Sequence, residues 1–168
     1  LNDTVKINLM KVFEVAFNEI ADSGKFSLGA LHKCYQKHLA RAAFCIAEGL
    51  DFHLAHQYRN EPELLLNLLC YGPIEKGRDA SHGGVDFYNM CCDGAGLAVV
   101  ADSFAALQTQ VVERKRIAWK ECVEAVRSDF RNENGEQIRR LLASSPRFGH
   151  GGTCADEWAV PLSHDFVE

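Results

Sequence analysis

Several features that other classes of protein need are missing from this sequence. Lys and Arg form no basic stripe and the net charge is −5 over 168 residues, so we set nucleic-acid binding aside. The apolar runs are too short to cross a bilayer, and we expect no membrane-spanning segment. Because no C-x2-C pair occurs anywhere in the chain, we also expect no structural zinc site and no other metal centre.

Two common catalytic motifs are absent as well. Gly94-Ala95-Gly96 begins like a dinucleotide-binding G-x-G-x-x-G, but residue 99 is Val and no βαβ pattern surrounds it. The chain contains no G-x-S-x-G elbow, which argues against a serine hydrolase. The residues alone therefore indicate a helical domain without indicating a reaction.

Cysteine is the residue type that is present in excess. Its seven positions are 34, 45, 70, 91, 92, 122 and 154. The odd number and irregular spacing are not those of a disulfide framework, so we expect reduced thiols and a cytoplasmic protein. Since free cysteine usually packs as a small apolar residue, we interpret Cys91 and Cys92 as buried thiols and rank a redox function lowest.

Hydrophobic periodicity predicts a mostly helical chain with little strand. The predicted helices begin near Val5, Leu28, Pro62, Leu97, Trp119 and Asn134. We expect Gly49 to end the second helix, and residues 85–88 to form one short strand. One strand cannot form a sheet alone, and the sequence starts at Leu1 rather than Met. Both observations lead us to expect a piece of a larger protein.

Four stretches, in order, resemble the pyruvate formate-lyase family of glycyl radical enzymes. They are INLMKVFEVAFNEI (7–20), PIEKGRDASHGGVDFYN (73–89), GAGLAVVADSFAAL (94–107) and IRRLLASSPRFGHGGTCAD (138–156). The resemblance implies a helix-dominated α/β fold, namely a fragment of the family's ten-stranded α/β barrel. Residues 1–168 are then a partial catalytic domain.

The family's two radical-bearing motifs are not found in this chain. The thiyl cysteine belongs to a G-C-x-E loop and the radical glycine to an R-V-x-G-[FY] loop, and neither pattern occurs here. We reject ECVE (121–124) because it lies within a predicted helix, and PRFGH (146–150) because it matches another turn of the family. The resemblance therefore places the cysteine loop before Leu1 and the glycine loop beyond Glu168.

The resemblance also implies an activity. A thiyl radical would abstract hydrogen from a small organic substrate in an anaerobic lyase, dehydratase or formate C-acetyltransferase, and this segment would be inert by itself. No cofactor is expected to bind directly, since a radical-SAM activating enzyme would install the glycine radical, and the full-length enzyme is expected to be a homodimer. The alternative is a stand-alone helical binding or assembly protein without catalysis.

In the family, the strand that carries Tyr-Asn ends at the substrate cavity. The resemblance therefore implies that the cavity is lined by Tyr88, Asn89, Cys91, Cys92 and Asp93. From the residues alone, Asn89 is equally suited to satisfying backbone at a strand end, and Tyr88 to a core position with a tethered hydroxyl. Because Met90 to Gly94 replaces the family's commoner Ser-Gly-Pro-Gln-Gly, the substrate cannot be inferred.

Neighbouring residues have structural interpretations. We expect Asp102 and Ser103 to stabilise the packing of a helix against a loop. We expect His82 and the Gly83-Gly84 pair to form a tight turn, because glycine adopts positive φ without strain.

Overall fold

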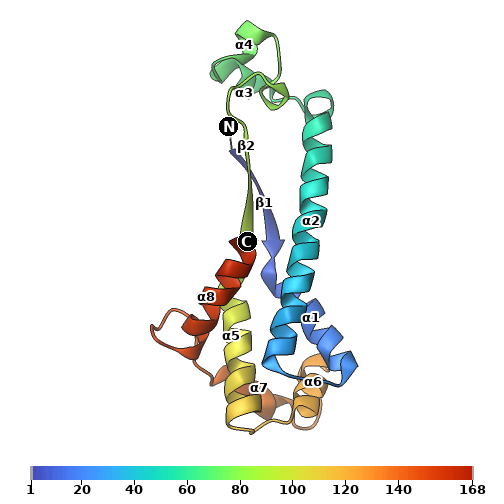
Figure 1. Ribbon diagram of the computed structural model, residues 1–168, viewed down its shortest axis with the longest axis vertical. Coiled ribbons are helices and arrows are strands. Elements are labelled where there is room, and N and C mark those ends of the chain that lie inside the picture. Colours follow the sequence, from blue (N-terminus) through green and yellow to red (C-terminus); the bar gives the residue numbers. More distant parts are fainter. Residues whose placement is uncertain (1, 168) are drawn as a thin grey trace. The chain divides into compact units, whose positions relative to one another are not determined.

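The computed structural model describes residues 2–167 (Figure 1). These residues form two compact units, one of residues 2–7 and 41–93 and the other of residues 8–40 and 94–167. The elements in chain order are β1 (Asn2–Asn8), α1 (Leu9–Ser23), α2 (Leu28–Asn60), α3 (Leu64–Leu69), α4 (Pro73–Lys76), the 3₁₀ helix η1 (Ala80–His82), β2 (Asn89–Ala95), α5 (Leu97–Leu107), the π-helix η2 (Gln108–Glu113), α6 (Trp119–Arg127), α7 (Gly135–Ala143) and α8 (Cys154–Val167).

The first unit contains a two-stranded sheet in which β1 pairs with β2. Figure 1 shows both strands running in the same direction. Two sequence predictions are wrong here. Residues 2–8, which we expected to begin a helix, form β1, and the predicted strand at 85–88 is displaced to 89–95. The prediction failed at β1 because Val5 and Leu9 fit a helical step, whereas Val5 and Ile7 also fit the alternation of a strand.

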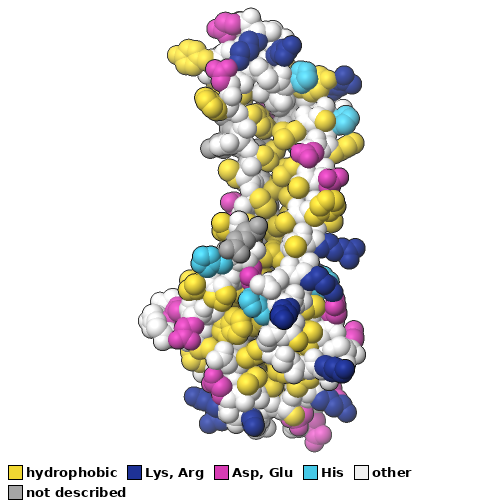
Figure 2. Space-filling view, viewed as in Figure 1, with side chains coloured by type: hydrophobic (Ala, Val, Ile, Leu, Met, Phe, Trp, Pro, Cys, Tyr) yellow, Lys and Arg dark blue, Asp and Glu magenta, His cyan; other side chains and the backbone are white. Residues whose placement is uncertain are grey.

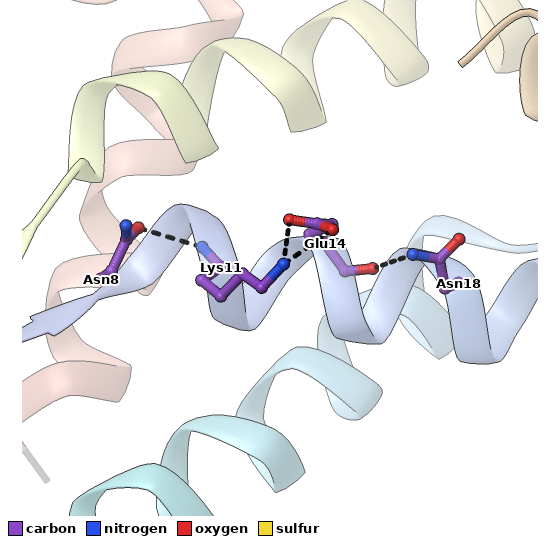
Figure 3. A network of polar contacts seen from close by, with 4 residues as sticks. All are labelled: Asn8, Lys11, Glu14 and Asn18. Atoms are coloured by element: carbon purple, nitrogen blue, oxygen red, sulfur yellow. Dashed lines mark hydrogen bonds and ion pairs between the residues drawn. The ribbon is translucent and has the colours of Figure 1, made fainter. Parts of the chain in front are cut away.

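The change from strand to helix at the start of α1 has a local cause (Figure 3). Asn8 is extended, and its side-chain oxygen accepts the backbone N–H of Lys11 at 3.0 Å, which satisfies one of the free N–H groups of the first turn. Farther along the exposed face, Lys11 pairs with Glu14 at 2.9 Å and Asn18 donates to the Glu14 carbonyl at 3.0 Å. This cap fixes Leu9 as the first helical residue.

Helix α2 runs through Gly49, so the predicted end at that residue is wrong. A glycine inside a helix costs about 1 kcal/mol relative to alanine, which lowers the stability of a helix without ending it. Gly49 is helical here, and a Cβ at that position would meet no other atom within 4 Å. Helix α3 begins at Leu64 rather than at Pro62.

The core of the second unit is an aromatic cluster that joins α1, α5 and α8. Phe104 of α5 is fully buried, stacks on Trp158 at 4.5 Å between ring centroids, and meets the edge of Phe13 at 5.2 Å. Tyr35 from the first part of α2 meets the same ring edge-on at 6.3 Å. The predicted apolar stripe of 97–107 is confirmed at Val100, Phe104 and Leu107, all buried.

Helices α6 and α7 begin where the sequence places them, at Trp119 and after Asn134. Asn134 is the N-cap residue of α7, but no hydrogen bond links its side chain to the first turn of the helix. Gly135 occupies that turn instead, and a Cβ there would lie 2.2 Å from the Phe130 carbonyl oxygen. A close backbone approach therefore sets the start of α7.

Within residues 2–167, no helix has both the length and the apolar character needed to cross a bilayer.

Candidate functional site

The sheet of the first unit has one face packed against a helix. A hollow of about 480 Å³ is bordered by Val5 and Lys6 of β1, by Met90 of β2, and by residues of α2 including Ile46 and Leu50. Since side chains alternate across a strand, the half-buried Val5 and the buried Ile7 lie on the face toward α2, and the exposed Thr4 and Lys6 lie on the opposite face. Lys6 also borders the hollow, so its exposure, not its contact with the hollow, assigns its face.

The same alternation divides the side chains of β2. Met90 is the only residue of β2 that is not exposed, and it borders the hollow beside α2. The alternation therefore places Cys92, which is exposed, on the same face as Met90. Asn89, Cys91 and Asp93 belong to the opposite face and are all exposed. We call the face that carries Thr4, Lys6, Asn89, Cys91 and Asp93 the open face of the sheet. It combines an amide, a thiol, a carboxylate, a hydroxyl and an ammonium group.

The five sequence-predicted site residues are thus not equivalent. Three of them, Asn89, Cys91 and Asp93, share the open face. Tyr88 precedes the strand, and its hydroxyl donates to Oε1 of Gln57 in α2 at 3.2 Å. Gln57 is itself buried, with 6% of its surface exposed. Tyr88 is therefore a residue with a tethered hydroxyl on the α2 side, as the interpretation from its residue type allowed.

Cys91 and Cys92 are both exposed in the described part of the chain. The interpretation of this pair as buried packing thiols is therefore wrong. The prediction relied on the usual preference of free cysteine for protein interiors. Both residues lie instead in a two-stranded sheet that leaves their side chains exposed.

Thr4 and Lys6 also lie on the open face, which could not be predicted because their segment was expected to form a helix. The alternating pattern Thr4-Val5-Lys6-Ile7 was the available signal. Lys6 adds a positive charge to an open face whose other ionisable side chains include Asp93, so the face offers both a cationic and an anionic group to a polar ligand.

The segment before β2 is held together by Asp79. Its carboxylate accepts the Glu63 N–H at 2.9 Å, the Asn67 side-chain amide at 2.7 Å, and both the N–H and the hydroxyl of Ser81. Partial burial opposes ionisation, but these hydrogen bonds outweigh it and hold the pKa of Asp79 below its usual value. Asp79 therefore connects α3 to η1 as an ionised group.

The tight turn expected at His82 to Gly84 is confirmed. His82 ends η1, and Gly83 follows in the left-handed region at φ 79°. A Cβ on Gly84 would lie 2.4 Å from the Arg78 carbonyl oxygen, so only glycine fits where the chain turns toward β2.

The rejected cysteine motif is structural. Cys122 lies inside α6, is fully buried, and burial raises the pKa of its thiol to about 12. A thiol with that pKa is neutral at physiological pH and shielded from solvent, so it is inert.

The expected role of Asp102 in helix–loop packing is also confirmed. Its carboxylate accepts the Phe148 N–H at 2.7 Å and lies 3.6 Å from Arg147. The Ser103 hydroxyl donates within α5 to the Val99 carbonyl at 2.7 Å. Both residues thus serve the local structure of the second unit.

A larger cavity of about 680 Å³ lies in the second unit, among α1, α5, α6 and α7. It is lined mainly by apolar side chains such as Phe13, Phe17 and Leu142. Of its charged lining residues, Arg127 pairs with Asp22 at 2.6 Å. Its chemistry is that of an apolar hollow, so the open face remains the better candidate for a reaction site.

A helix-dominated α/β segment with parallel strands, each followed directly by a helix, is the arrangement of an α/β barrel wall. The pyruvate formate lyase-like family model matches residues 1–168, and the chain belongs to that family.

Curated relatives are dehydratases and lyases. The chain is 27% identical to the trans-4-hydroxy-L-proline dehydratase of Clostridioides difficile over 59% of its own length and 12% of that protein. It is 38% identical to the isethionate sulfite-lyase of Desulfovibrio desulfuricans over 42% of its length and 8% of that protein. The chain thus spans only a small part of the relatives it matches.

Solved structures agree on the fold. The hydroxyproline dehydratase of C. difficile superposes with a TM-score of 0.80 at 21% identity, covering 96% of this chain and 22% of that one. The B12-independent glycerol dehydratase of Clostridium butyricum superposes with a TM-score of 0.78 over the same shares at 21% identity. The predicted fold class, a segment of the glycyl radical enzyme barrel, is confirmed.

Proposed function

We propose that residues 1–168 form part of the cavity wall of a glycyl radical dehydratase or lyase. The observation that carries this proposal is the family match over the whole chain, together with relatives that remove water or sulfite. These relatives favour elimination over formate acetyltransfer. The substrate class is a small polar molecule with a leaving group next to the carbon that loses hydrogen.

In this class of reaction, a thiyl radical takes a hydrogen atom from substrate carbon and returns it after the leaving group has departed, so no external oxidant is consumed. The residues of the proposed cavity wall would bind and orient the substrate and transfer a proton. Asn89 has both a donor and an acceptor to orient substrate hydroxyl or carboxylate groups. Asp93 is placed to exchange a proton with the leaving group, and Lys6 to neutralise an anionic substituent.

The proposed activity also needs groups that residues 1–168 do not contain. The thiyl cysteine and the radical glycine are assigned to segments outside residues 1–168, since the sequence contains neither motif. A radical-SAM activating enzyme installs the radical, the complete protein is a homodimer, and residues 1–168 alone do not catalyse.

A surface of the first unit supports this view. Large apolar side chains of α3 and the segment after it are exposed, namely Leu64, Leu65, Leu68, Leu69, Tyr71 and Ile74. Figure 2 shows hydrophobic side chains at the surface of this unit. Large apolar side chains that gather at an exposed surface mark protein–protein contacts, and a wall segment of a larger enzyme would need such a contact.

The test uses the complete natural polypeptide that carries residues 1–168, produced without oxygen together with a radical-SAM activase. We expect electron paramagnetic resonance to show a glycyl radical. We expect turnover of at least one of trans-4-hydroxy-L-proline, isethionate, glycerol and 1,2-propanediol.

Sequencing the reading frame around these residues provides a second test of the proposal. A continuous frame without an upstream G-C-x-E and a downstream glycine loop would contradict the proposal and favour a stand-alone helical binding protein. A radical that forms without eliminating a leaving group from any of the four compounds would contradict the dehydratase or lyase assignment.

A further inference from the structure

Three side chains of types that can bind a metal meet where α1 lies beside the first turns of α2. Cys34 and His38 are four residues apart on α2, so both project from the same face of the helix. Glu19 of α1 completes the cluster, and the donor atoms of all three residues lie within 4.8 Å of one another. All three belong to the second unit.

The cluster is partly shielded from solvent. Cys34 is buried, with 7% of its surface exposed, and the side chain of His38 is 15% exposed. The Glu19 carboxylate contacts His38 Nε2 at 2.7 Å and Lys37 Nζ at 2.5 Å.

We propose that Glu19, Cys34 and His38 bind a divalent zinc-class ion that links α1 to α2. A thiolate, an imidazole and a carboxylate are the protein ligands that Zn²⁺ uses, and water fills the fourth position in sites with three protein ligands. The Glu19 side chain is 48% exposed, so solvent reaches this side of the cluster. This inference does not depend on the proposed reaction.

The distances fit with a small adjustment. Tetrahedral Zn²⁺ bonds of about 2.0–2.3 Å place neighbouring donor atoms about 3.3–3.6 Å apart. The His38–Glu19 separation of 2.7 Å is shorter, and the upper limit of 4.8 Å for the cluster is longer. Each differs from the ideal by roughly 1 Å, so metal binding requires side-chain movements of about that size.

Lys37 is expected to oppose metal binding. Its ammonium group now pairs with the Glu19 carboxylate, and it therefore competes with a cation for the same oxygen atoms. Metal binding displaces this contact and removes the proton from the Cys34 thiol and from any protonated His38. Removing the Lys37 charge should leave metal affinity unchanged or raise it.

This site could not be predicted from residue spacing. It contains no C-x2-C pair, and Glu19 lies 15 positions before Cys34, beyond the turn that joins the two helices. The expectation of no metal centre rested on the spacing of zinc ribbons and fingers. Ligands contributed by two helices escape a search of that kind.

The test is a Co²⁺ titration of the complete polypeptide carrying Cys91→Ser and Cys92→Ser, followed by absorption spectroscopy. We expect the visible bands of tetrahedral Co²⁺ and a thiolate-to-metal charge-transfer band, with competition by Zn²⁺. Cys34→Ala should abolish the charge-transfer band. His38→Ala and Glu19→Gln should each weaken binding at least about 10-fold.

Lys37→Ala is the matched control, since it changes a neighbouring charge without removing a ligand. It should bind Co²⁺ as tightly as the parent or more tightly. Co²⁺ spectra without a thiolate band, or binding that survives both Cys34→Ala and Glu19→Gln, would overturn the site. Because Glu19 is half-exposed, its amide variant is expected to fold and keeps the test decisive.

Discussion

Replacing Phe104 by alanine should lower the stability of α5 by about 3–5 kcal/mol, the usual cost of deleting a buried phenylalanine ring. The ring is completely buried, stacks on Trp158 at 4.5 Å, and meets Phe13 at 5.2 Å. Its removal leaves a cavity that joins three helices and that none of them can fill without moving. The expected loss is a large part of the stability of an ordinary domain.

Hydrogen exchange of the α5 backbone amides in the complete polypeptide measures this effect. A loss of that size should speed exchange by about 100-fold or more, since 1.4 kcal/mol corresponds to a factor of ten. Phe52→Ala is the control, because Phe52 is 69% exposed on α2 and should change local exchange by less than about 5-fold. Equal effects of the two substitutions would show that Phe104 is not a core residue.

Replacing Asp93 by asparagine should lower kcat of the activated enzyme by about 100-fold or more, as expected when a proton-transfer group is lost. Asp93 and Asn have nearly the same size, so the substitution removes the charge and proton affinity without changing the shape of the strand. Because the amide still fills the position and can accept a hydrogen bond, KM should change little.

Cys92→Ser is the matched control for this prediction. Cys92 is the preceding residue on β2 but lies on the face shared with Met90, toward α2. We expect its kcat to stay within about 3-fold of the parent, because serine keeps the size of the side chain on a face away from the proposed reaction. A Cys92→Ser effect as large as that of Asp93→Asn would contradict the assignment of the two faces.

The helices and the sheet differ in how well they could be predicted from sequence. The stripe of Val100, Phe104 and Leu107 fits only a helix, and α5 forms there. Val5 and Leu9 fit a helix too, yet they belong to β1 and α1, because Asn8 caps the helix between them. In a short strand only a few apolar residues alternate. That signal is too weak to favour a strand when the same residues also have the spacing of a helix.

The second strand was displaced for a different reason. Val85 to Tyr88 has the β-branched and aromatic residues that favour strands, but the strand forms over Asn89 to Ala95, a segment of small and polar residues. Propensity is a weak guide where the neighbouring strand and helix decide the pairing. The family motifs did locate this segment, since they match residues before and after it.

The candidate site was predictable only in part. The resemblance brought together Tyr88, Asn89, Cys91, Cys92 and Asp93, but it could not separate the residues of the two faces. That separation needs the strand limits and the position of Met90 beside α2. Thr4 and Lys6 come from a strand that lies more than 80 positions earlier, and only the pairing of β1 with β2 places them on the same face.

Cysteine labelling tests most directly whether the open face of β2 lines the substrate cavity. The adjacent thiols Cys91 and Cys92 lie on opposite faces of one strand, so each serves as a control for the other. In the complete enzyme, an added substrate from the set named above should slow alkylation of Cys91 at least about 10-fold, since bound substrate would cover that thiol. Alkylation of Cys92, followed in the same digest by mass spectrometry, should continue at its original rate. Protection of Cys92 with Cys91 still reactive, or no protection of either under turnover conditions, would contradict the account.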